Sequence, residues 1–175
     1  MAPETFELAR LRLRRPKLSD ADALFAIGSD PEVAYFAEWP LNTERGPALE
    51  RLRQRAVQWE AGTEYYWIIT LACDERAIGA VSTRVDQHTA DVGYLLDRQH
   101  WGNGYATEAG RAIVDWAFAV PTIRRVWATC DAENVASARV LEKIGLEREG
   151  TLRRAIVRPN ISAEPRDAFI YSRVR

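Results

Sequence analysis

Residues 89–118 constrain the fold of this chain more than any other stretch. Residues 89–96 contain short, β-branched and aromatic side chains and no strand breaker except Gly93, which favours a buried strand with a local irregularity. Residues 97–104 hold two more glycines and cannot continue this strand. From Ala106 onward, apolar residues recur at steps of three and four, the period of a helix with one buried face. The stretch therefore predicts a strand, a glycine turn and a helix in succession.

The two glycines of the turn, Gly102 and Gly104, stand where the predicted helix begins. A helix start leaves about four backbone N–H groups unpaired and carries roughly half a positive charge. Residues without a side chain let a phosphate approach those groups closely. The turn is therefore a candidate anion site, and an ordinary tight turn is the alternative.

Two nucleotide-binding motifs fit this turn poorly. The phosphate loop of nucleotide triphosphatases requires a lysine after its last glycine, and none follows Gly104. The dinucleotide motif requires a third glycine, where Thr107 stands, and an acidic residue at a strand end about twenty residues later. Residues 126–128 read as strand interior there. Both motifs are disfavoured, although a nucleotide-binding domain that uses the same glycines stays as a rival hypothesis.

The turn resembles the acyl-CoA loop of the GNAT superfamily of N-acetyltransferases, whose pattern is Q/R-x-x-G-x-G/A. Here the pattern reads Gln99-x-x-Gly102-x-Gly104. Residues 92–109 as a whole look like the branch that contains the ribosomal-protein alanine N-acetyltransferases. Residues 134–146 resemble the N-x-x-S…E-K-x-G-F segment of the same branch, with leucine in place of the phenylalanine. The two blocks have the order and spacing of that family, so the resemblance covers nearly the whole chain.

The resemblance implies a single α/β domain over residues 1–175. Its expected sheet is mixed, largely antiparallel and twisted, with one splayed parallel pair of strands and helices on both faces. From the residue pattern, strands are expected before Pro16 (through Leu8, Leu11 and Leu13) and over residues 65–72, 77–84, 89–96, 123–129, 147–158 and 168–174, the last two joined by a polar loop. Helices are expected after a capping box at residues 19–22, from a cap at Thr43 to residues 61–62, from Ala106, and from residue 138 to Gly145.

Composition and charge are those of an ordinary globular protein. A length of 175 residues fits one domain, and 47% apolar with 28% charged residues suits a chain with a sizeable core. The net charge of −1 argues against nucleic acid or an anionic membrane as a partner. No apolar run approaches the ~20 residues of a membrane span. Cys73 and Cys130 lack a metal-binding spacing, so we expect no metal, no disulfide and a cytoplasmic location.

The resemblance implies acetyl-CoA as the co-substrate. The N–H groups of residues 101–107 would hold its pyrophosphate, and the strand end at residues 94–96 would offer backbone groups to the pantetheine arm, because the family splays its parallel strands there. Asn134 would contact the pantetheine, although an asparagine before a helix is alternatively a cap. Arg98, Gln99 and Lys143 are candidate phosphate partners or plain surface residues. The residues expected at the cofactor are Tyr94, Leu95, Leu96, Gln99, Trp101, Gly102, Asn103, Gly104, Tyr105, Ala106, Thr107, Asn134 and Lys143.

Direct acetyl transfer in a ternary complex needs a deprotonated amine and a proton for the leaving thiolate. The family resemblance places Ser137 near the sulfur, so Ser137 is the candidate acid. Asp91, on the strand that leads to the donor site, is the candidate base, or else a structural carboxylate. The ribosomal branch has a glutamate that residues 154–158 lack, which counts against a ribosomal substrate. An amine deprotonated through ordered water would need no dedicated base.

The acceptor is less constrained than the donor. Tyr35, Phe36 and Trp39 lie where the family has its substrate-facing loop, and they are expected to line the acceptor pocket or to pack under the next helix. The first expectation for the acceptor is the N-terminal amine of a protein or peptide. A small amine, such as a polyamine, an amino acid or an antibiotic, is the alternative. A non-catalytic acyl-CoA sensor is a further rival, and a homodimer is possible.

Overall fold

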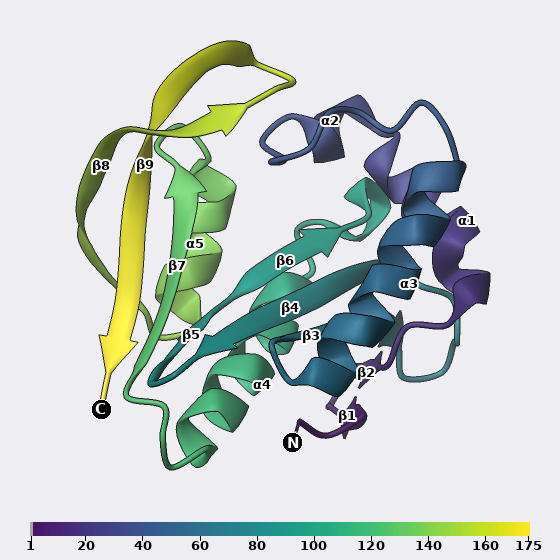
Figure 1. Ribbon diagram of the computed structural model, residues 1–175, viewed down its shortest axis with the longest axis horizontal. Helices are drawn as coiled ribbons and strands as arrows, with labels where there is room; N and C mark the ends of the chain where they lie inside the picture. Colours follow the sequence, from purple (N-terminus) through teal and green to yellow (C-terminus); the bar gives the residue numbers. More distant parts are fainter. Residues whose placement is uncertain (1) are drawn as a thin grey trace.

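The computed structural model describes residues 2–175, which form a nine-stranded sheet with helices packed on it (Figure 1). The strand order is β1-β2-β3-β4-β5-β7-β9-β8, and β6 pairs with β4 off this path. None of the helices in this range is long and apolar enough to cross a membrane. The strands are β1 (Thr5–Glu7), β2 (Leu11–Arg14), β3 (Glu64–Leu71), β4 (Gly79–Asp86), β5 (Thr89–Asp91), β6 (Gly93–Leu96), β7 (Arg125–Asp131), β8 (Glu147–Arg158) and β9 (Ser162–Val174). The helices are α1 (Ala21–Gly28), α2 (Pro31–Ala34), α3 (Gly46–Ala61), α4 (Tyr105–Ala119) and α5 (Val135–Lys143), with 3-10 turns η1 (Leu18–Asp20) and η2 (Arg98–His100).

The predicted strand at residues 89–96 is divided into β5 and β6, and this division opens the sheet. β5 pairs with β4 on one side and in parallel with β7 on the other, and the Val92 N–H still donates to the Trp127 carbonyl oxygen at 2.9 Å. Within residues 2–175, β6 has only β4 as a strand partner. β6 approaches β4 closely because Gly79 has no side chain: a Cβ there would lie 2.3 Å from the carbonyl oxygen of Leu95. The splayed parallel pair and the largely antiparallel mixed sheet are therefore confirmed.

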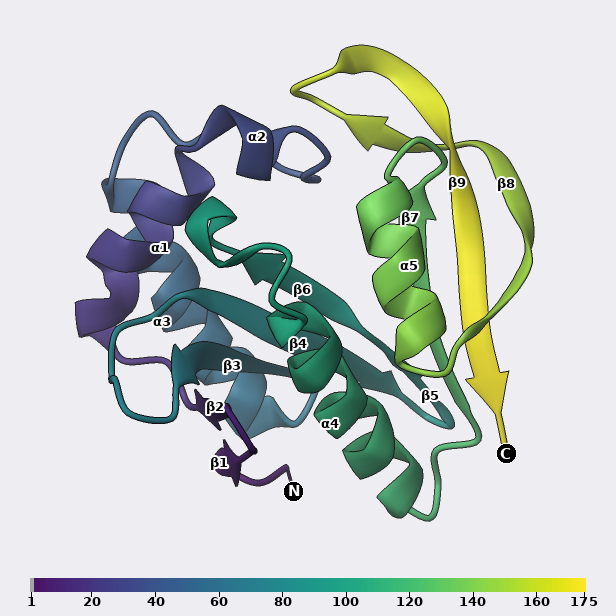
Figure 2. The ribbon, with the colours of Figure 1, turned by 180° about the vertical axis from the view of Figure 1, so that it is seen from behind.

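Helices cover both faces of the sheet. α4 and α5 lie on one face, and α3 lies on the other with α1 beside it (Figures 1 and 2). α4 has the apolar stripe expected from the sequence, since Ala109, Ile113 and Ala117 are fully buried. Trp116 of α4 packs on Trp67 of β3, with ring centroids 5.9 Å apart. Burying one large apolar side chain contributes about 1.5–3 kcal/mol, so this packing anchors α4, and with it the glycine turn, to the sheet.

The two edges of the sheet differ from the predicted strands. The sequence pattern predicts one strand before Pro16, but the chain forms a hairpin of β1 and β2 there. β9 begins at Ser162, so the polar loop before it shrinks to residues 159–161. Pro165 is tolerated in β9 because β7 ends opposite Ala168 and the last bond on that side runs from the Ala132 N–H to the Asp167 carbonyl oxygen, which leaves residues 162–166 paired with β8 only.

Two predicted helix caps are wrong. α3 begins at Gly46 and has Arg45 as its N-cap residue, so Thr43 does not cap it. Residues 19–22 form no capping box for α1, because the Asp20 carboxylate instead accepts hydrogen bonds from the Arg14 guanidinium at 2.7 and 2.9 Å. The predicted helix ends at Gly62 and Gly145 are confirmed, and both glycines have positive φ angles, of 69° and 89°.

Candidate active site

The glycine turn leads from the splayed strand β6 to an open helix start. The first bond from α4 back to the turn runs from the Glu108 N–H to the Gly104 carbonyl oxygen at 3.0 Å, so the N–H groups of residues 105–107 have no acceptor within the helix. Gly102 and Gly104 have φ angles of 77° and 76°, in the left-handed region that favours glycine. Among the described residues no side chain caps this helix. The helix start therefore keeps its N–H donors and its partial positive charge available for an anion.

Arg10, in the turn between β1 and β2, holds this loop in place. Its backbone N–H and its Nε donate to the two carboxylate oxygens of Glu108, at 2.9 and 2.8 Å. Its Nη1 donates to the Asn103 carbonyl oxygen at 2.8 Å, and its guanidinium lies 4.9 Å from the centre of the Tyr105 ring. Glu108 is an acidic residue in the first turn of α4, where an unpaired carboxylate would repel an anion. No local sequence signal identifies Arg10, because its partners are more than 90 residues away along the chain.

Two predicted cofactor residues, Trp101 and Asn103, shape the turn through their side chains. Trp101 Nε1 donates to the Leu96 carbonyl oxygen at 2.8 Å. The Asn103 amide donates to the carbonyl oxygens of His100 and Trp101, at 3.2 and 3.1 Å. These bonds fix the shape of the turn. The Trp101 N–H, expected at the pyrophosphate, donates instead to the Arg98 carbonyl oxygen at 3.1 Å and so is not free for an anion.

The backbone N–H groups at the strand end, residues 94–96, point in alternating directions. The Asp97 N–H donates to the Ile78 carbonyl oxygen at 2.8 Å. Because hydrogen bonds alternate along an antiparallel pair, Leu95 directs its N–H to β4, whereas Tyr94 and Leu96 direct theirs toward the gap. In a regular parallel ladder the Tyr94 N–H would bond to β7, but the strands have already diverged. The groups available to a pantetheine arm are therefore those of Tyr94 and the N–H of Leu96, because the Leu96 carbonyl oxygen already accepts the Trp101 indole N–H.

The predicted phosphate partners are less well placed. Gln99 and Lys143 are exposed and make no side-chain hydrogen bond or ion pair within the described range of the chain. Arg98 pairs with Asp30 at 3.3 Å and with Glu32, so it joins η2 to α2. Arg98 therefore links the turn to residues 30–41, which contain α2 and are called the α2 segment below. Phosphate contacts by Gln99 and Lys143 stay predictions.

Ser137 lies in a pair of hydroxyl groups between β6 and α5. The Tyr94 hydroxyl is 2.9 Å from Ser137 Oγ and 3.1 Å from the Ser137 carbonyl oxygen. Asn134 Oδ1 accepts the Ser137 N–H at 3.0 Å, so Asn134 is the N-cap of α5 as the alternative interpretation holds. A contact from Asn134 to pantetheine stays a prediction. The sequence analysis assigns Tyr94 through its backbone only, whereas its hydroxyl is the closest proton donor to Ser137.

The surroundings of this hydroxyl pair keep the Tyr94 phenol and the nearby Cys130 thiol protonated. Burial raises the pKa of Tyr94 well above its usual value, and the hydrogen bond with Ser137 opposes this only in part. Burial also raises the pKa of Cys130, on β7, to about 11, with the Asp131 carboxylate adding to the increase and Ser137 opposing it. At neutral pH the two side chains are therefore a phenol and a thiol, and neither is a nucleophile.

Asp91 is partly buried at the carboxyl end of β5. Its Oδ1 accepts the Arg84 N–H at 2.7 Å. Burial raises the pKa of Asp91, the hydrogen bond from Arg84 opposes this, and the nearby charge of Glu38 raises the pKa further. A carboxylate with a raised pKa is a better proton acceptor than a free aspartate. Asp91 thus has the properties of a base, and the same contacts also hold β4 and β5 together.

Charged side chains continue from Asp91 across the acceptor side of the sheet. Arg84 lies 3.7 Å from Asp91 and 3.9 Å from the buried Glu64, which pairs with Arg55 of α3. No motif in the sequence identifies this cluster. One local signal exists: Arg55 follows Leu52 by three positions and so falls on the apolar stripe of α3.

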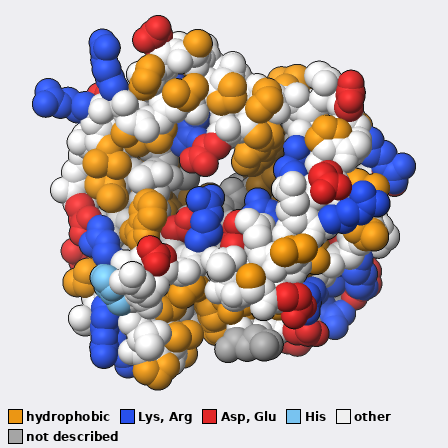
Figure 3. Space-filling view, in the orientation of Figure 1, with side chains coloured by type: hydrophobic (Ala, Val, Ile, Leu, Met, Phe, Trp, Pro, Cys, Tyr) orange, Lys and Arg blue, Asp and Glu red, His pale blue; other side chains and the backbone are white. Residues whose placement is uncertain are grey.

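The other wall of the acceptor side is joined to the α2 segment. Asn160, between β8 and β9, accepts the Leu41 N–H at 2.8 Å and donates to the carbonyl oxygens of Ala34 and Trp39, at 2.6 and 2.9 Å. Arg158 Nη1 lies 3.3 Å from Glu38 Oε1. Figure 3 shows a hollow on this face, between the α2 segment and the β8–β9 hairpin, with acidic and basic side chains gathered in it.

The three predicted pocket residues lie on this α2 segment. Tyr35 is 45% exposed and packs edge-on against Phe36, with ring centroids 4.9 Å apart. Trp39 is half-buried, and its backbone is held by Asn160. An exposed aromatic side chain next to a hollow suits contact with a ligand, and their role at the acceptor stays a prediction.

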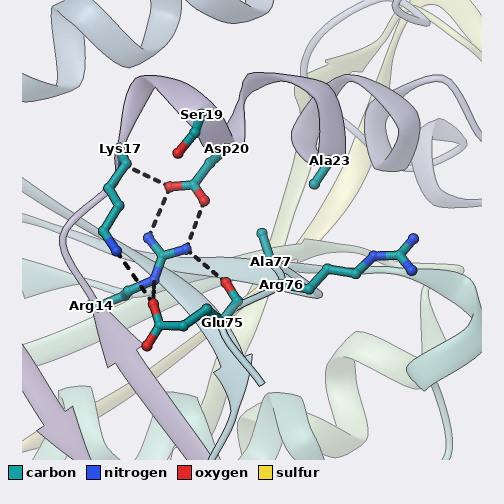
Figure 4. A pocket seen from close by; sticks show the side chains of 8 residues that line it. All are labelled: Arg14, Lys17, Ser19, Asp20, Ala23, Glu75, Arg76 and Ala77. Carbon is teal, nitrogen blue, oxygen red and sulfur yellow. Dashed lines mark hydrogen bonds and ion pairs between the residues drawn. The ribbon is translucent and has the colours of Figure 1, made fainter. Parts of the chain in front are cut away.

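A second concavity, outside this site, is occupied by its own ion pairs. The buried Arg14 donates to both carboxylate oxygens of Asp20 and to the backbone carbonyl oxygens of Arg15 and Glu75, and its Nε lies 3.3 Å from Glu75 Oε2 (Figure 4). Lys17 also pairs with Glu75, at 3.3 Å. These groups pair with one another, so the charges of Arg14, Lys17, Asp20 and Glu75 are largely neutralised within the concavity.

Comparisons with known proteins agree with the fold. A family model described as acetyltransferase (GNAT) domain matches residues 10–147. The uncharacterized N-acetyltransferase p20 of Bacillus licheniformis is 33% identical over 154 residues, which cover 86% of this chain and 86% of that protein. Two solved structures have the same fold. RimL, a ribosomal L7/L12 alpha-N-protein acetyltransferase in complex with coenzyme A, has a TM-score of 0.87 at 20% identity over 98% of both chains. The microcin C7 self immunity acetyltransferase MccE, in complex with acetyl-CoA and AMP, has a TM-score of 0.87 at 22% identity over 99% of this chain and 98% of its own. The matched family model and the near full-length relative show that this protein belongs to the GNAT family of acetyltransferases.

Proposed function

We propose that this protein transfers the acetyl group of acetyl-CoA to a primary amine, by direct attack of the amine in a ternary complex. The observation that carries the proposal is the hydroxyl pair of Tyr94 and Ser137, which stands where β6 leaves β7. The open start of α4 follows the same strand. An anion site, a free strand edge and a protonated hydroxyl pair thus lie along one short segment of the chain.

The donor would be held mainly by backbone groups. N–H groups of residues 102–107 bind the pyrophosphate at the open helix start, and Arg10 keeps the turn in the required shape. The backbone of Tyr94 and the N–H of Leu96 pair with the pantetheine amides, much as an added strand would. These contacts fix the thioester next to Ser137 and bring its carbonyl carbon within reach of the amine.

The hydroxyl pair would supply the proton to the leaving thiolate. As the amine nitrogen bonds to the acyl carbon and the carbon–sulfur bond breaks, Ser137 Oγ donates its proton to the sulfur. The Tyr94 hydroxyl stays protonated at neutral pH and is hydrogen-bonded to Ser137, which regains a proton from solvent after the thiol leaves, while the proton taken from the amine is released to solvent. Asn134 fixes the position of Ser137 by capping α5.

Asp91 would take the proton from the amine, directly or through a water molecule. Only the ionised carboxylate accepts a proton, so kcat/KM rises as the pH passes upward through the pKa of Asp91. Because burial raises that pKa, the rise lies above the range of an ordinary aspartate. A pH–rate profile checks this, and Asp91→Asn should remove that limb of the profile.

The acceptor we place first is the N-terminal amine of a protein or peptide, in line with the similarity to RimL, a ribosomal L7/L12 alpha-N-protein acetyltransferase. The fixed joint between Asn160 and the α2 segment favours a second class, a small amine, because it narrows the acceptor side. The absence of a carboxylate from residues 154–158 also counts against a ribosomal substrate. A non-catalytic acyl-CoA sensor stays the rival from a different class.

The first experiment is calorimetric binding of acetyl-CoA to the purified protein, followed by thiol release with a panel of N-terminal peptides and small amines. We expect tight binding of acetyl-CoA, and thiol release with one class of acceptor. Ser137→Ala should lower kcat by about 10²-fold or more and leave the Kd of acetyl-CoA within about twofold. Ser172→Ala is the matched control, since Ser172 lies on β9 and bonds to Glu149.

The outcomes separate the rival functions. Binding with no release from any amine would favour the sensor. Competition by a free dinucleotide, with no preference for CoA thioesters, would favour the nucleotide-binding domain and overturn the proposal.

A further inference from the structure

Arg158, the last residue of β8, is a buried cation with too few partners. Its side chain is 6% exposed, and its only ion pair within residues 2–175 is to Glu38 at 3.3 Å. Its Nε is buried and has no hydrogen-bond partner. Burying a guanidinium is costly unless its donors are satisfied, so this side chain is poised for a further anionic partner.

Arg14 provides the internal comparison. It is equally buried, at 7% side-chain exposure, but it makes four hydrogen bonds and two ion-pair contacts (Figure 4). Arg158 makes no side-chain hydrogen bond within the described part of the chain, and its one carboxylate partner, Glu38, is 62% exposed. The Nε of each arginine lacks a hydrogen-bond partner, so the two differ at their terminal nitrogens: those of Arg14 are satisfied within the protein, whereas those of Arg158 have only the ion pair with Glu38.

Arg158 has neighbours on the side of the candidate acid and on the side of the candidate base. On one side, its charge acts on Cys130 and Asp131 at the end of β7, and Cys130 is a neighbour of Ser137. On the other side, it pairs with Glu38, whose charge acts on Asp91. Asp131 itself cannot serve as the missing partner, because Arg166 already occupies both of its carboxylate oxygens, at 2.7 and 3.2 Å.

The position of Arg158 is fixed in advance of binding. The Ile161 N–H donates to its carbonyl oxygen at 2.8 Å, which closes the turn of the hairpin. Asn160, two residues along, fixes that turn to three backbone groups of the α2 segment. A preorganised cation binds an anion with little loss of conformational entropy.

We infer that Arg158 binds an anionic group carried by the amine acceptor, a carboxylate or a phosphate a few bonds from the reacting nitrogen. The inference rests on the proposed function and narrows its acceptor class. In the free protein Glu38 stands in for that anion, and its exposed side chain can leave when the acceptor arrives. Arg158 is then a specificity-determining residue, and acceptors that carry only positive charge are excluded.

The test compares matched acceptors that differ only in the anionic group. One arm pairs short ω-amino acids with their carboxamides, and the other pairs phosphoethanolamine with ethanolamine, all at saturating acetyl-CoA. We expect the native protein to use the anionic member of at least one arm with a kcat/KM at least about tenfold higher, because a charge-assisted bidentate bond is involved. The arm that responds tells carboxylate from phosphate.

Three variants locate the effect at Arg158. Arg158→Gln should raise KM for the anionic acceptor about tenfold or more, with KM for the neutral member and the Kd of CoA unchanged. Arg158→Lys should retain part of the preference, because it keeps the charge and loses the bidentate geometry. Glu38→Gln should lower KM for the anionic acceptor, since a competing carboxylate is removed. Thermal melting of each variant confirms that it is folded.

The result that overturns the inference is an equal preference in the native protein and in folded Arg158→Gln or Arg158→Lys. A native preference for the neutral members, or failure of every anionic probe to react with or bind to the CoA-loaded protein, overturns it as well. In those cases intact CoA binding and turnover of another amine leave the proposed function standing. Loss of CoA binding by the native protein removes the proposed function itself.

Discussion

The donor side and the acceptor side of the cleft are built in different ways. The donor side consists of backbone groups from one continuous segment, residues 94–107, with a hydroxyl pair beside it. The acceptor side consists of side chains from distant segments: Glu38, Asp91, Arg158 and Asn160. A backbone site depends on chain geometry and so is retained as a unit, whereas a site made of side chains can be changed one residue at a time. One fold can therefore keep a fixed donor and serve different acceptors.

The largest expected effect comes from filling the turn on the donor side. Gly104 has a φ angle of 76°, which a β-branched residue rarely adopts, and its missing side chain leaves the helix start open. Gly104→Val should weaken acetyl-CoA binding by about 30-fold or more, measured by calorimetry, because it both strains the turn and blocks the N–H groups.

Gly46→Ala is the matched control, since a Cβ at Gly46, at the start of α3, would meet no atom within 4 Å. Its CoA affinity should equal that of the native protein. Unchanged acetyl-CoA affinity in Gly104→Val would show that the turn is an ordinary turn. The donor side would then not be a site made of backbone groups.

The donor side is also the part that the sequence predicts well. The glycine turn and the helix after it follow from spacing, because each depends on residues close together in the chain, whereas the pattern of residues 89–96 predicts one strand with a local irregularity and its splay is implied by the family resemblance. The predicted pairing of Ser137 with the donor site has a local basis too, in the cap formed by Asn134. What the sequence misses here is Arg10, which acts across more than 90 residues.

The acceptor side is predicted poorly for a physical reason. Its contacts join residues that are more than 100 positions apart, such as Asn160 with Leu41 and with Ala34. The aromatic residues of the α2 segment draw attention by composition, whereas the charges that line the hollow look like ordinary surface charges in the sequence. Arg158 is an example, since an arginine at the end of an exposed strand gives no sign of being buried.

The second effect in size tests whether the donor side depends on a single distant side chain. Arg10→Ala should weaken CoA binding about tenfold, because it frees the Asn103 carbonyl group and leaves the Glu108 carboxylate unpaired at the helix start. The loss should be greater at low salt than at high salt. Calorimetry at two ionic strengths measures it.

A double variant separates shape from charge in that effect. Arg10→Ala with Glu108→Gln should recover part of the lost affinity, because the repelling charge is gone while the turn is still loose. Arg12→Ala is the matched control: Arg12 is a neighbour in the same hairpin and pairs with Glu7 and Glu75, away from the loop. If Arg10→Ala binds CoA with native affinity, Arg10 contributes to the stability of the fold and not to CoA binding.

The third expected effect is on binding of the amine acceptor alone. Asn160→Ala removes three hydrogen bonds between the hairpin and the α2 segment, each worth about 0.5–1.5 kcal/mol. We expect KM for the amine to rise about fivefold and Tm to fall by about 4–8 °C, with the Kd of CoA unchanged. Ser162→Ala, in the same hairpin and bonded only to Glu164, serves as the control. If Asn160→Ala weakened CoA binding as much as it raised KM for the amine, the donor side and the acceptor side would be coupled and could not be treated as separate.

The smallest effect concerns the point where the two sides meet. Tyr94→Phe removes one hydroxyl and keeps the ring, so CoA binding should stay within about twofold, while kcat should fall about fivefold because Ser137 loses a hydrogen bond worth ~1 kcal/mol. Tyr171→Phe is the control, since Tyr171 is also buried but bonds to Glu142 on the far side of α5. A native kcat in Tyr94→Phe would mean that the cap of Asn134 alone positions Ser137. A loss as large as that of Ser137→Ala would mean that the two hydroxyl groups act as one proton donor, and the catalytic group would then belong to the strand as much as to the helix.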